Sequence, residues 1–172
     1  MKIGILLFPF FCLFLSLFVL ITDPAFTYLL LEKEAVQPTK QLFKYFAGRA
    51  EIPEIFDDTE KAHFGDVKKI IWGSFALLII LTLICCKEWE KIAKKGTLLL
   101  LALILLAVMM PFDTLFTIFH QVLFPQGNWM FPADSTIITF YPMSFFITYA
   151  IAIAIHAVIT AGILLEIVSR KG

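Results

Sequence analysis

Four long apolar runs dominate this chain, and each can cross a lipid bilayer. A transmembrane helix needs about 20 mostly apolar residues, with a working range of roughly 17 to 25. The runs cover residues 3–21, 70–86, 97–111 (continuing towards His120) and 142–168. At 60% hydrophobic residues and a mean hydropathy of +0.89, the chain carries more apolar surface than a soluble domain of 172 residues can bury. The sequence predicts an all-α membrane protein with spans at about 3–22, 69–87, 97–119 and 142–168.

Basic residues set the expected orientation. Lys2 precedes the first run, a lysine cluster separates the second from the third, and Arg170 and Lys171 follow the last, whereas residues 111–143 contain no lysine or arginine. The cluster consists of Lys87, Lys91, Lys94 and Lys95. The positive-inside rule therefore places both termini in the cytoplasm. Residues 23–68 become an extracytoplasmic cap, and residues 120–141 an outer loop, within a single membrane domain of residues 1–172. The first run is longer than the roughly 7–15-residue core of a signal peptide, so we expect an uncleaved span.

A helix with a titratable stripe is predicted just before the second run. The segment DDTEKAHFGDVKKIIW has no breaker except Gly65, and Asp57 offers an N-cap oxygen. Glu60, His63 and Asp66 recur at i, i+3 and i+6, which places them close to one face of a helix. A carboxylate one turn away can fix the tautomer of a histidine and raise its basicity. Acidic residues also favour any solvated helix start, so this stripe alone does not assign a function.

The outer loop combines a second histidine with many aromatic residues. Asp113, Phe116 and His120 share a predicted helical face, Asn128 lies in a turn, and Asp134 precedes a short apolar helix. The aromatic residues expected to contact a substrate are Phe116, Phe119, Phe124, Trp129, Phe131 and Tyr141. Each feature has a structural explanation, such as headgroup anchoring by aromatic rings or helix capping. Together with His63 on the same outer face, however, they predict an acid–base histidine pair in an aromatic, water-poor pocket.

Two motifs in the outer segments resemble a known family. The first is ExxHxxDV, formed by Glu60, His63, Asp66 and Val67. The second is FHxxxFxxxNWxFxxD…YP, formed by Phe119, His120, Phe124, Asn128, Trp129, Phe131, Asp134, Tyr141 and Pro142. In this order, across four spans, an outer cap and a motif loop, they resemble the bacterial lipoprotein intramolecular transacylase family, called Lit.

The resemblance implies an acyltransferase of the bacterial cell envelope. Its substrate would be a diacylglyceryl lipoprotein, and one acyl chain would move from the sn-2 ester to the α-amine of the N-terminal cysteine, giving a lyso-form lipoprotein. The multi-pass protein would lie in the cytoplasmic membrane with its active site on the extracytoplasmic face. It would need no cofactor or metal, and no nucleic-acid partner is expected.

The resemblance also assigns the catalytic roles to His63 and His120. We expect His63 to act as the base for the amine and His120 as the acid or oxyanion partner, although the sequence leaves the reverse order open. The expected supporting residues are Glu60, Asp66, Asp113, Asn128 and Asp134.

Other function classes fit the sequence less well. A zinc-dependent membrane hydrolase could use His63, Asp66, His120 and Asp134, but their spacing matches no short zinc motif. A non-enzymatic adaptor or small transport subunit is a further alternative, although transporters usually carry polar or broken segments at mid-membrane and internal repeats. A thiol–quinone oxidoreductase is excluded because the outer segments contain no cysteine.

Overall fold

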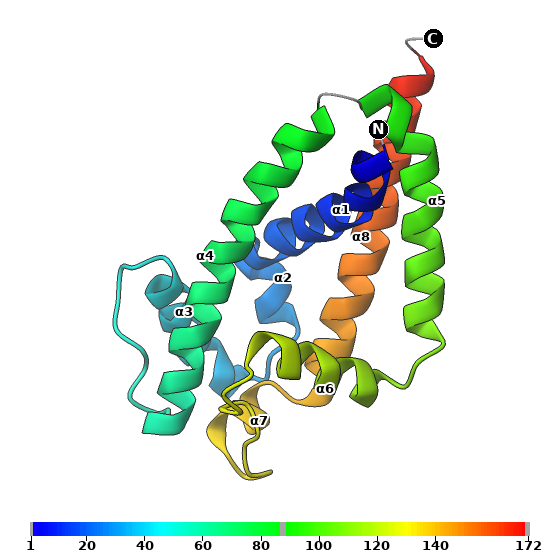
Figure 1. The fold of residues 1–172 in the computed structure, drawn as a ribbon. Helices are drawn as coiled ribbons and strands as arrows, with labels where there is room; N and C mark the ends of the chain where they lie inside the picture. The colour runs from blue at the N-terminus through cyan, green and yellow to red at the C-terminus, as the bar shows by residue number, and fades with distance from the viewer. Residues whose placement is uncertain (1, 87–88, 171–172) are drawn as a thin grey trace. The chain divides into compact units, whose positions relative to one another are not determined.

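The computed structural model describes residues 2–86 and 89–170, and all regular secondary structure in these ranges is α-helical (Figure 1). The helices are α1 (Lys2–Thr22), α2 (Pro24–Leu29), α3 (Lys33–Phe46), α4 (Asp58–Cys86), α5 (Trp89–Val108), α6 (Phe112–Leu123), α7 (Thr136–Phe140) and α8 (Met143–Ser169). The predicted span end at Lys87, and Lys87 and Lys171 as orienting charges, lie outside the described residues.

Three helices in the described ranges are long and apolar enough to cross a membrane: α1, the Asp58–Cys85 part of α4, and α8. The helices α5 and α6 pass the same test as one bent pair, which gives up to four spans. The all-helical fold with membrane-spanning helices is therefore confirmed. Helix α4 also runs without a break from Asp58, so Gly65 does not interrupt it.

The expected continuity of the helix over residues 97–119 is wrong, while a third span made of this bent pair stays a prediction. Helix α5 ends at Val108, and a separate helix, α6, begins at Phe112 after a sharp bend. Pro111 explains the break, because proline lacks a backbone N–H and disfavours the helical conformation of the residue before it. His120 consequently belongs to a separate short helix, α6.

The described residues of the chain divide into two compact units. The first comprises residues 2–19, 74–112 and 150–170 and packs α1 against parts of α4, α5 and α8. Gly96 on α5 allows a close approach, since a Cβ there would lie 2.6 Å from the Phe8 side chain. Ser16 Oγ lies 3.0 Å from Nδ1 of His156, which joins α1 to α8 through polar side chains.

The second unit comprises residues 20–73 and 113–149 and contains the cap and the outer loop. Its apolar core includes Leu42 and Phe56 from the cap together with Ile137 and Tyr141 from the outer loop. A hydrogen bond of 2.7 Å joins the hydroxyls of Thr39 and Tyr141. Cap and loop therefore fold as one body, and both outer histidines lie in it.

Candidate active site

A capping box fixes the start of α4. The Asp57 carboxylate accepts a hydrogen bond from the backbone N–H of Glu60 (2.8 Å), and Oε2 of Glu60 accepts one from the N–H of Asp57 (2.9 Å). Oε1 of Glu60 accepts a third bond, from the N–H of Ile137 at the start of α7 (2.7 Å). With only 1% of its surface exposed, Glu60 anchors the outer loop to α4. Both of its oxygens accept hydrogen bonds from backbone N–H groups, so Glu60 is a candidate positioning residue for His63 through the loop that it holds.

Two turns further along α4, Asp66 binds the other end of the same loop. Its Oδ2 accepts hydrogen bonds from the side-chain amides of Gln126 (2.9 Å) and Asn128 (2.8 Å), and its Oδ1 pairs with Lys69 (2.8 Å). The hydrogen bonds from Lys69 and then Asn128 are the main causes that lower the pKa of Asp66 below its usual value. The carboxylate is therefore charged at neutral pH and holds the turn at residues 126–128.

His63 and His120 lie between these two attachments. Both are buried, with 7% and 8% of their surfaces exposed, and their ring centroids are 6.4 Å apart at an interplanar angle of 21°. His63 comes from α4, in the charged stretch before its apolar span, and His120 comes from α6. The structure thus brings together two imidazoles that are distant in sequence.

Aromatic rings surround both imidazoles. Phe124 contacts both histidines, at 4.6 Å from His63 and 5.5 Å from His120 between ring centroids. The ring centroid of Phe131 lies 5.4 Å from that of His63. Around His120, the centroid distances are 4.0 Å to Phe116, 5.0 Å to Trp129 and 5.3 Å to Phe119. Five of the six predicted substrate-contacting aromatics therefore line the histidine pair. Such walls are stiff and exclude water, which strengthens hydrogen bonds and charges inside them.

Burial controls the protonation of the pair. It lowers the pKa of His63 to about 4; the nearby His120 acts in the same direction, while Asp66 and a hydrogen bond with the Asn128 backbone oppose it. Burial also lowers the pKa of His120, against a hydrogen bond with the Phe116 carbonyl. Both rings are accordingly neutral at pH 7.

The hydrogen bonds distinguish the ring nitrogens. Nδ1 of His120 lies 2.8 Å from the carbonyl oxygen of Phe116. A carbonyl can only accept, so this Nδ1 carries the proton, and Nε2 of the neutral ring presents a lone pair. In the described part of the chain, Nδ1 of His63 is buried and has no hydrogen-bond partner. Buried polar atoms are rarely left in this state, which marks this nitrogen as available to a bound substrate.

Three predicted residues lie away from the histidine pair. Asp113, in the first turn of α6, and Asp134 are exposed at the surface, and Ser135, not Asp134, provides the side-chain oxygen that caps α7. Tyr141 is buried in the core of the second unit, where it contacts Thr39 and Phe64, and its contact with a substrate stays a prediction. Among the described residues, no three His, Cys, Asp or Glu side chains form a group that could hold a metal ion.

Gln126 is the site-supporting residue that the sequence did not reveal. Its amide bonds to both Asp66 and Asn128, although it reads as an ordinary turn residue. No local pattern signals this role, because its main partner, Asp66, lies on α4, 60 residues earlier in the sequence.

Helix α6 presents three different faces. Phe116 and His120 point to the site, and Thr114, Thr117 and Gln121 form a polar face. The third face is an apolar stripe at i, i+3, i+4 and i+7, formed by Leu115, Ile118, Phe119 and Val122. Val122 is 70% exposed and Phe119 54% exposed. The Phe119 ring also contacts His120, so it lies at the boundary between this stripe and the site.

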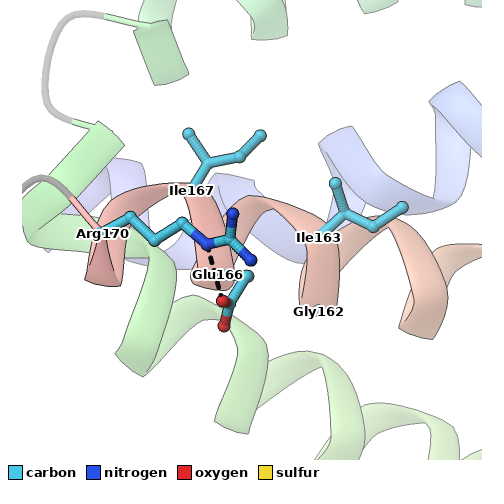
Figure 2. Close-up of a pocket in the computed structure, with 5 residues that line it drawn as sticks. All are labelled: Gly162, Ile163, Glu166, Ile167 and Arg170. Atoms are coloured by element: carbon cyan, nitrogen blue, oxygen red, sulfur yellow. Dashed lines mark hydrogen bonds and ion pairs between the residues drawn. The ribbon is translucent and has the colours of Figure 1, made fainter.

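The pocket in Figure 2 lies elsewhere, in the first unit. It is lined by Gly162, Ile163, Glu166 and Ile167 from the last turns of α8 and by Arg170, which follows this helix, and an ion pair of 2.9 Å joins Glu166 to Arg170. A hollow along one face of a single helix, without any of the candidate residues, does not have the composition of an active site. The histidine pair therefore remains the candidate site.

Comparisons with known proteins agree with these observations. The family model described as lipoprotein intramolecular transacylase Lit matches residues 2–146. A search of curated proteins finds no match. Three solved structures match, all of the membrane integral lipoprotein intramolecular transacylase Lit from Bacillus cereus. One has a TM-score of 0.68 at 21% identity and covers 99% of this chain and 96% of that chain.

The other two structures are variants of the same Bacillus cereus protein in which a histidine is replaced by alanine or by arginine. The alanine variant has a TM-score of 0.61 at 20% identity, with 98% of this chain and 92% of that chain covered. The arginine variant has a TM-score of 0.58 at 21% identity, with 99% and 92% covered. At these identities the likeness concerns the fold.

Proposed function

We infer the chemistry of this chain from one premise: it belongs to the lipoprotein intramolecular transacylase Lit family. It is thus an acyltransferase and a multi-pass membrane protein. We propose that it acts on a diacylglyceryl lipoprotein in the bacterial cytoplasmic membrane and that the histidine pair faces the extracytoplasmic side. The observation that carries the proposal is the pair of buried imidazoles inside an aromatic wall.

In the proposed reaction, the α-amine of the N-terminal cysteine attacks the carbonyl carbon of the sn-2 ester. A C–N bond forms, and the C–O bond to the glyceryl oxygen breaks. The amine loses a proton, and the departing glyceryl oxygen gains one. The products are an N-acyl chain and a free glyceryl hydroxyl, so atoms and charge balance without a cofactor or an external water molecule.

Because the amine and the ester belong to one substrate, the protein need not supply a covalent nucleophile. The main requirement is to hold a flexible headgroup in the cyclic geometry that brings amine and carbonyl together. Orientation of this kind contributes roughly 7 to 11 kcal/mol when the geometry is ideal. The rings of Phe124, Trp129 and Phe131 suit this task, because they are rigid and contact the histidine pair directly.

His120 is the proposed base, which is the reverse of the order expected from the carboxylates near His63. The Phe116 carbonyl holds the proton of the neutral ring on Nδ1, so Nε2 can accept the proton of the amine. The same carbonyl, together with the face of the Trp129 ring 5.0 Å away, stabilises the imidazolium that forms. The protonated Nε2 then delivers its proton to the glyceryl oxygen. General acid–base catalysis of this type contributes roughly 10²- to 10⁴-fold.

His63 is the proposed hydrogen-bond donor to the developing oxyanion. Its Nδ1 is buried and unpartnered among the described residues, its low pKa keeps the ring neutral, and the donor role requires the tautomer whose single proton is on Nδ1. A neutral imidazole can stabilise a carbonyl oxygen as its charge develops, and one such donor contributes up to about 10²- to 10³-fold.

The migrating acyl chain is proposed to lie along the apolar stripe of α6. No charged residue occurs from Thr114 to Ala133, so this surface suits hydrocarbon better than a headgroup or a polypeptide. Phe119 connects the stripe to His120, and this contact supports a position of the chain's carbonyl end beside the proposed base. The lipid substrate can thus enter from the membrane side while the amine enters from the polar side.

The test uses purified wild-type protein, His63→Ala and His120→Ala in lipid nanodiscs with a synthetic diacylglyceryl lipopeptide. Mass spectrometry with fragmentation shows whether the acyl chain has moved from glycerol to nitrogen, since total mass is unchanged. Wild-type protein should convert the substrate, and each variant should lose at least about 100-fold in rate. Conversion at the wild-type rate by either variant would remove that histidine from the mechanism, and no conversion by the wild type would refute the proposed reaction.

A further inference from the structure

Asp66, Gln126 and Asn128 form a closed triangle of hydrogen bonds at the rim of the histidine site. The Gln126 amide nitrogen donates to Oδ2 of Asp66 and to Oδ1 of Asn128, each at 2.9 Å. The Asn128 amide nitrogen donates to the same Oδ2 of Asp66 at 2.8 Å. Every edge of the triangle has its donor and acceptor assigned, and both N–H groups of Gln126 are used. We call this arrangement the polar clasp.

The clasp acts on the site through the backbone. Asn128 is followed directly by Trp129, whose ring contacts His120, and the Asn128 backbone lies close enough to His63 to oppose the lowering of its pKa by burial. Fixing the Asn128 side chain therefore fixes one neighbour of each histidine. The turn itself offers little intrinsic order, because Gly127 adopts a positive φ of 82° and has no side chain to pack. Its conformation depends on the contacts at its two ends.

Charge explains why the clasp needs a hydrogen-bond donor at position 126. Asp66 is an acceptor-only carboxylate with a lowered pKa, so its partners must be donors. Asn128 Oδ1 is a second acceptor that faces the same point. Two converging acceptors require a group that presents two N–H bonds in nearly the same place, which the Gln126 carboxamide does.

We propose that Gln126 is a positioning residue for the transacylase reaction, which locks the Asn128–Trp129 turn against the histidine pair by donating to both Asp66 and Asn128. The inference rests on the proposed function, because it concerns the rate of that reaction. Asp66 then has two effects. Its carboxylate holds the turn by hydrogen bonds, and its charge acts on His63 without a direct contact.

The experiment compares a variant that loses the N–H donors of Gln126 with one that keeps N–H donors. Gln126→Glu is isosteric but replaces the two N–H donors with an acceptor beside the charged Asp66. Gln126→Lys changes the shape but keeps several donors and a favourable charge. Gln121→Glu and Gln121→Lys are the matched controls, because Gln121 is an exposed glutamine on the polar face of α6.

At pH 7.5, Gln126→Glu should lower kcat by about 10- to 100-fold, whereas Gln126→Lys and both control variants should remain within about 3-fold of wild type. Lowering the pH should restore part of the Gln126→Glu activity relative to wild type, since protonation of the new carboxyl supplies an O–H donor. A role in packing alone would favour the isosteric glutamate over the lysine, and it would not respond to pH.

The outcomes separate this inference from the proposed function. If wild-type protein does not transfer the acyl chain, the reaction is wrong. If the wild type is active but Gln126→Glu is equally active, or lysine is as harmful as glutamate, the clasp is refuted. Thermal unfolding of each purified variant identifies a folding defect, and the pH dependence of activity per folded molecule tests Gln126→Glu even if that variant is less stable.

Discussion

The buried carboxylate of Glu60 gives the sharpest test of how the site is built. The sequence suggested that Glu60 supports the basicity of His63, whereas the structure engages both of its oxygens with backbone N–H groups of Asp57 and Ile137. Glu60→Gln keeps the volume of the side chain and separates the two roles. It should lower stability and leave the pH dependence of the remaining activity unchanged.

The size of the effect follows from the hydrogen bonds. Glutamine has one oxygen, so it can serve one of the two N–H groups and turns an NH₂ towards the other. The loss of one buried hydrogen bond to a charged group costs about 1.5 to 3 kcal/mol of folding free energy. For a protein of this length, each kcal/mol corresponds to roughly 2 to 4 °C, so the midpoint of thermal unfolding should fall by about 3 to 12 °C. Glu60→Ala orphans both N–H groups and should cost about twice as much.

Intrinsic tryptophan fluorescence can follow unfolding in detergent, since Trp72 and Trp129 both lie in the second unit. The acyl-transfer assay is then run from pH 5 to 9 at a temperature where the variant stays folded. An unfolding midpoint within 1 °C of wild type, together with a displaced pH profile, would refute the capping role and restore Glu60 as the proton partner of His63. Asp58→Asn, an exposed change in the same first turn, is the control for altered charge.

Three further predictions follow. The wild-type rate should rise from acidic pH and reach a plateau, because burial lowers the pKa of the proposed base below its ordinary 6.5 and the substrate amine titrates near 7.7 to 8.0. A rate that falls again near neutral pH would show that a histidine acts first as an acid. His156→Ala should leave turnover per folded molecule unchanged and cost about 0.5 to 1.5 kcal/mol through the lost bond to Ser16, measured by thermal unfolding, and a loss of turnover would place His156 in the chemistry. Gly96→Ala should destabilise the first unit by about 1 to 3 kcal/mol, since the new Cβ would lie 2.6 Å from Phe8, and unchanged stability would contradict that close approach.

Local signals in the sequence were enough to predict the long apolar helices and the start of α4. The uncharged runs identified the apolar helices, and the N-cap oxygen of Asp57 identified the start of α4. The error at the third run has the same local origin. Pro111 was present in the sequence, but the apolar residues after it maintained the appearance of a continuous span, and α6 is instead a separate helix.

The partners of the polar side chains could not be predicted in this way. Glu60 binds the N–H of Ile137, and Asp66 binds Gln126 and Asn128, across sequence separations that no local pattern encodes. Tyr141 was expected beside the substrate because aromatic residues at a membrane boundary often line pockets or face headgroups. Its hydroxyl instead satisfies Thr39 inside the core, and this pairing exists only once the cap has folded over it.

The spacing of Glu60, His63 and Asp66 nevertheless has a physical reason. The stripe on α4 is a docking surface for the outer loop: one carboxylate binds the N–H of Ile137, and the other binds the turn at residues 126–128. The histidine between them faces the intervening segment, and Phe131 from that segment covers its ring. Moving either carboxylate by one residue would rotate it about 100° away from this face and release one end of the loop. The i, i+3, i+6 pattern therefore encodes the position of the loop over the imidazole. The two flanking residues are acidic because their carboxylates accept the hydrogen bonds that the backbone N–H and side-chain amide groups of the loop donate.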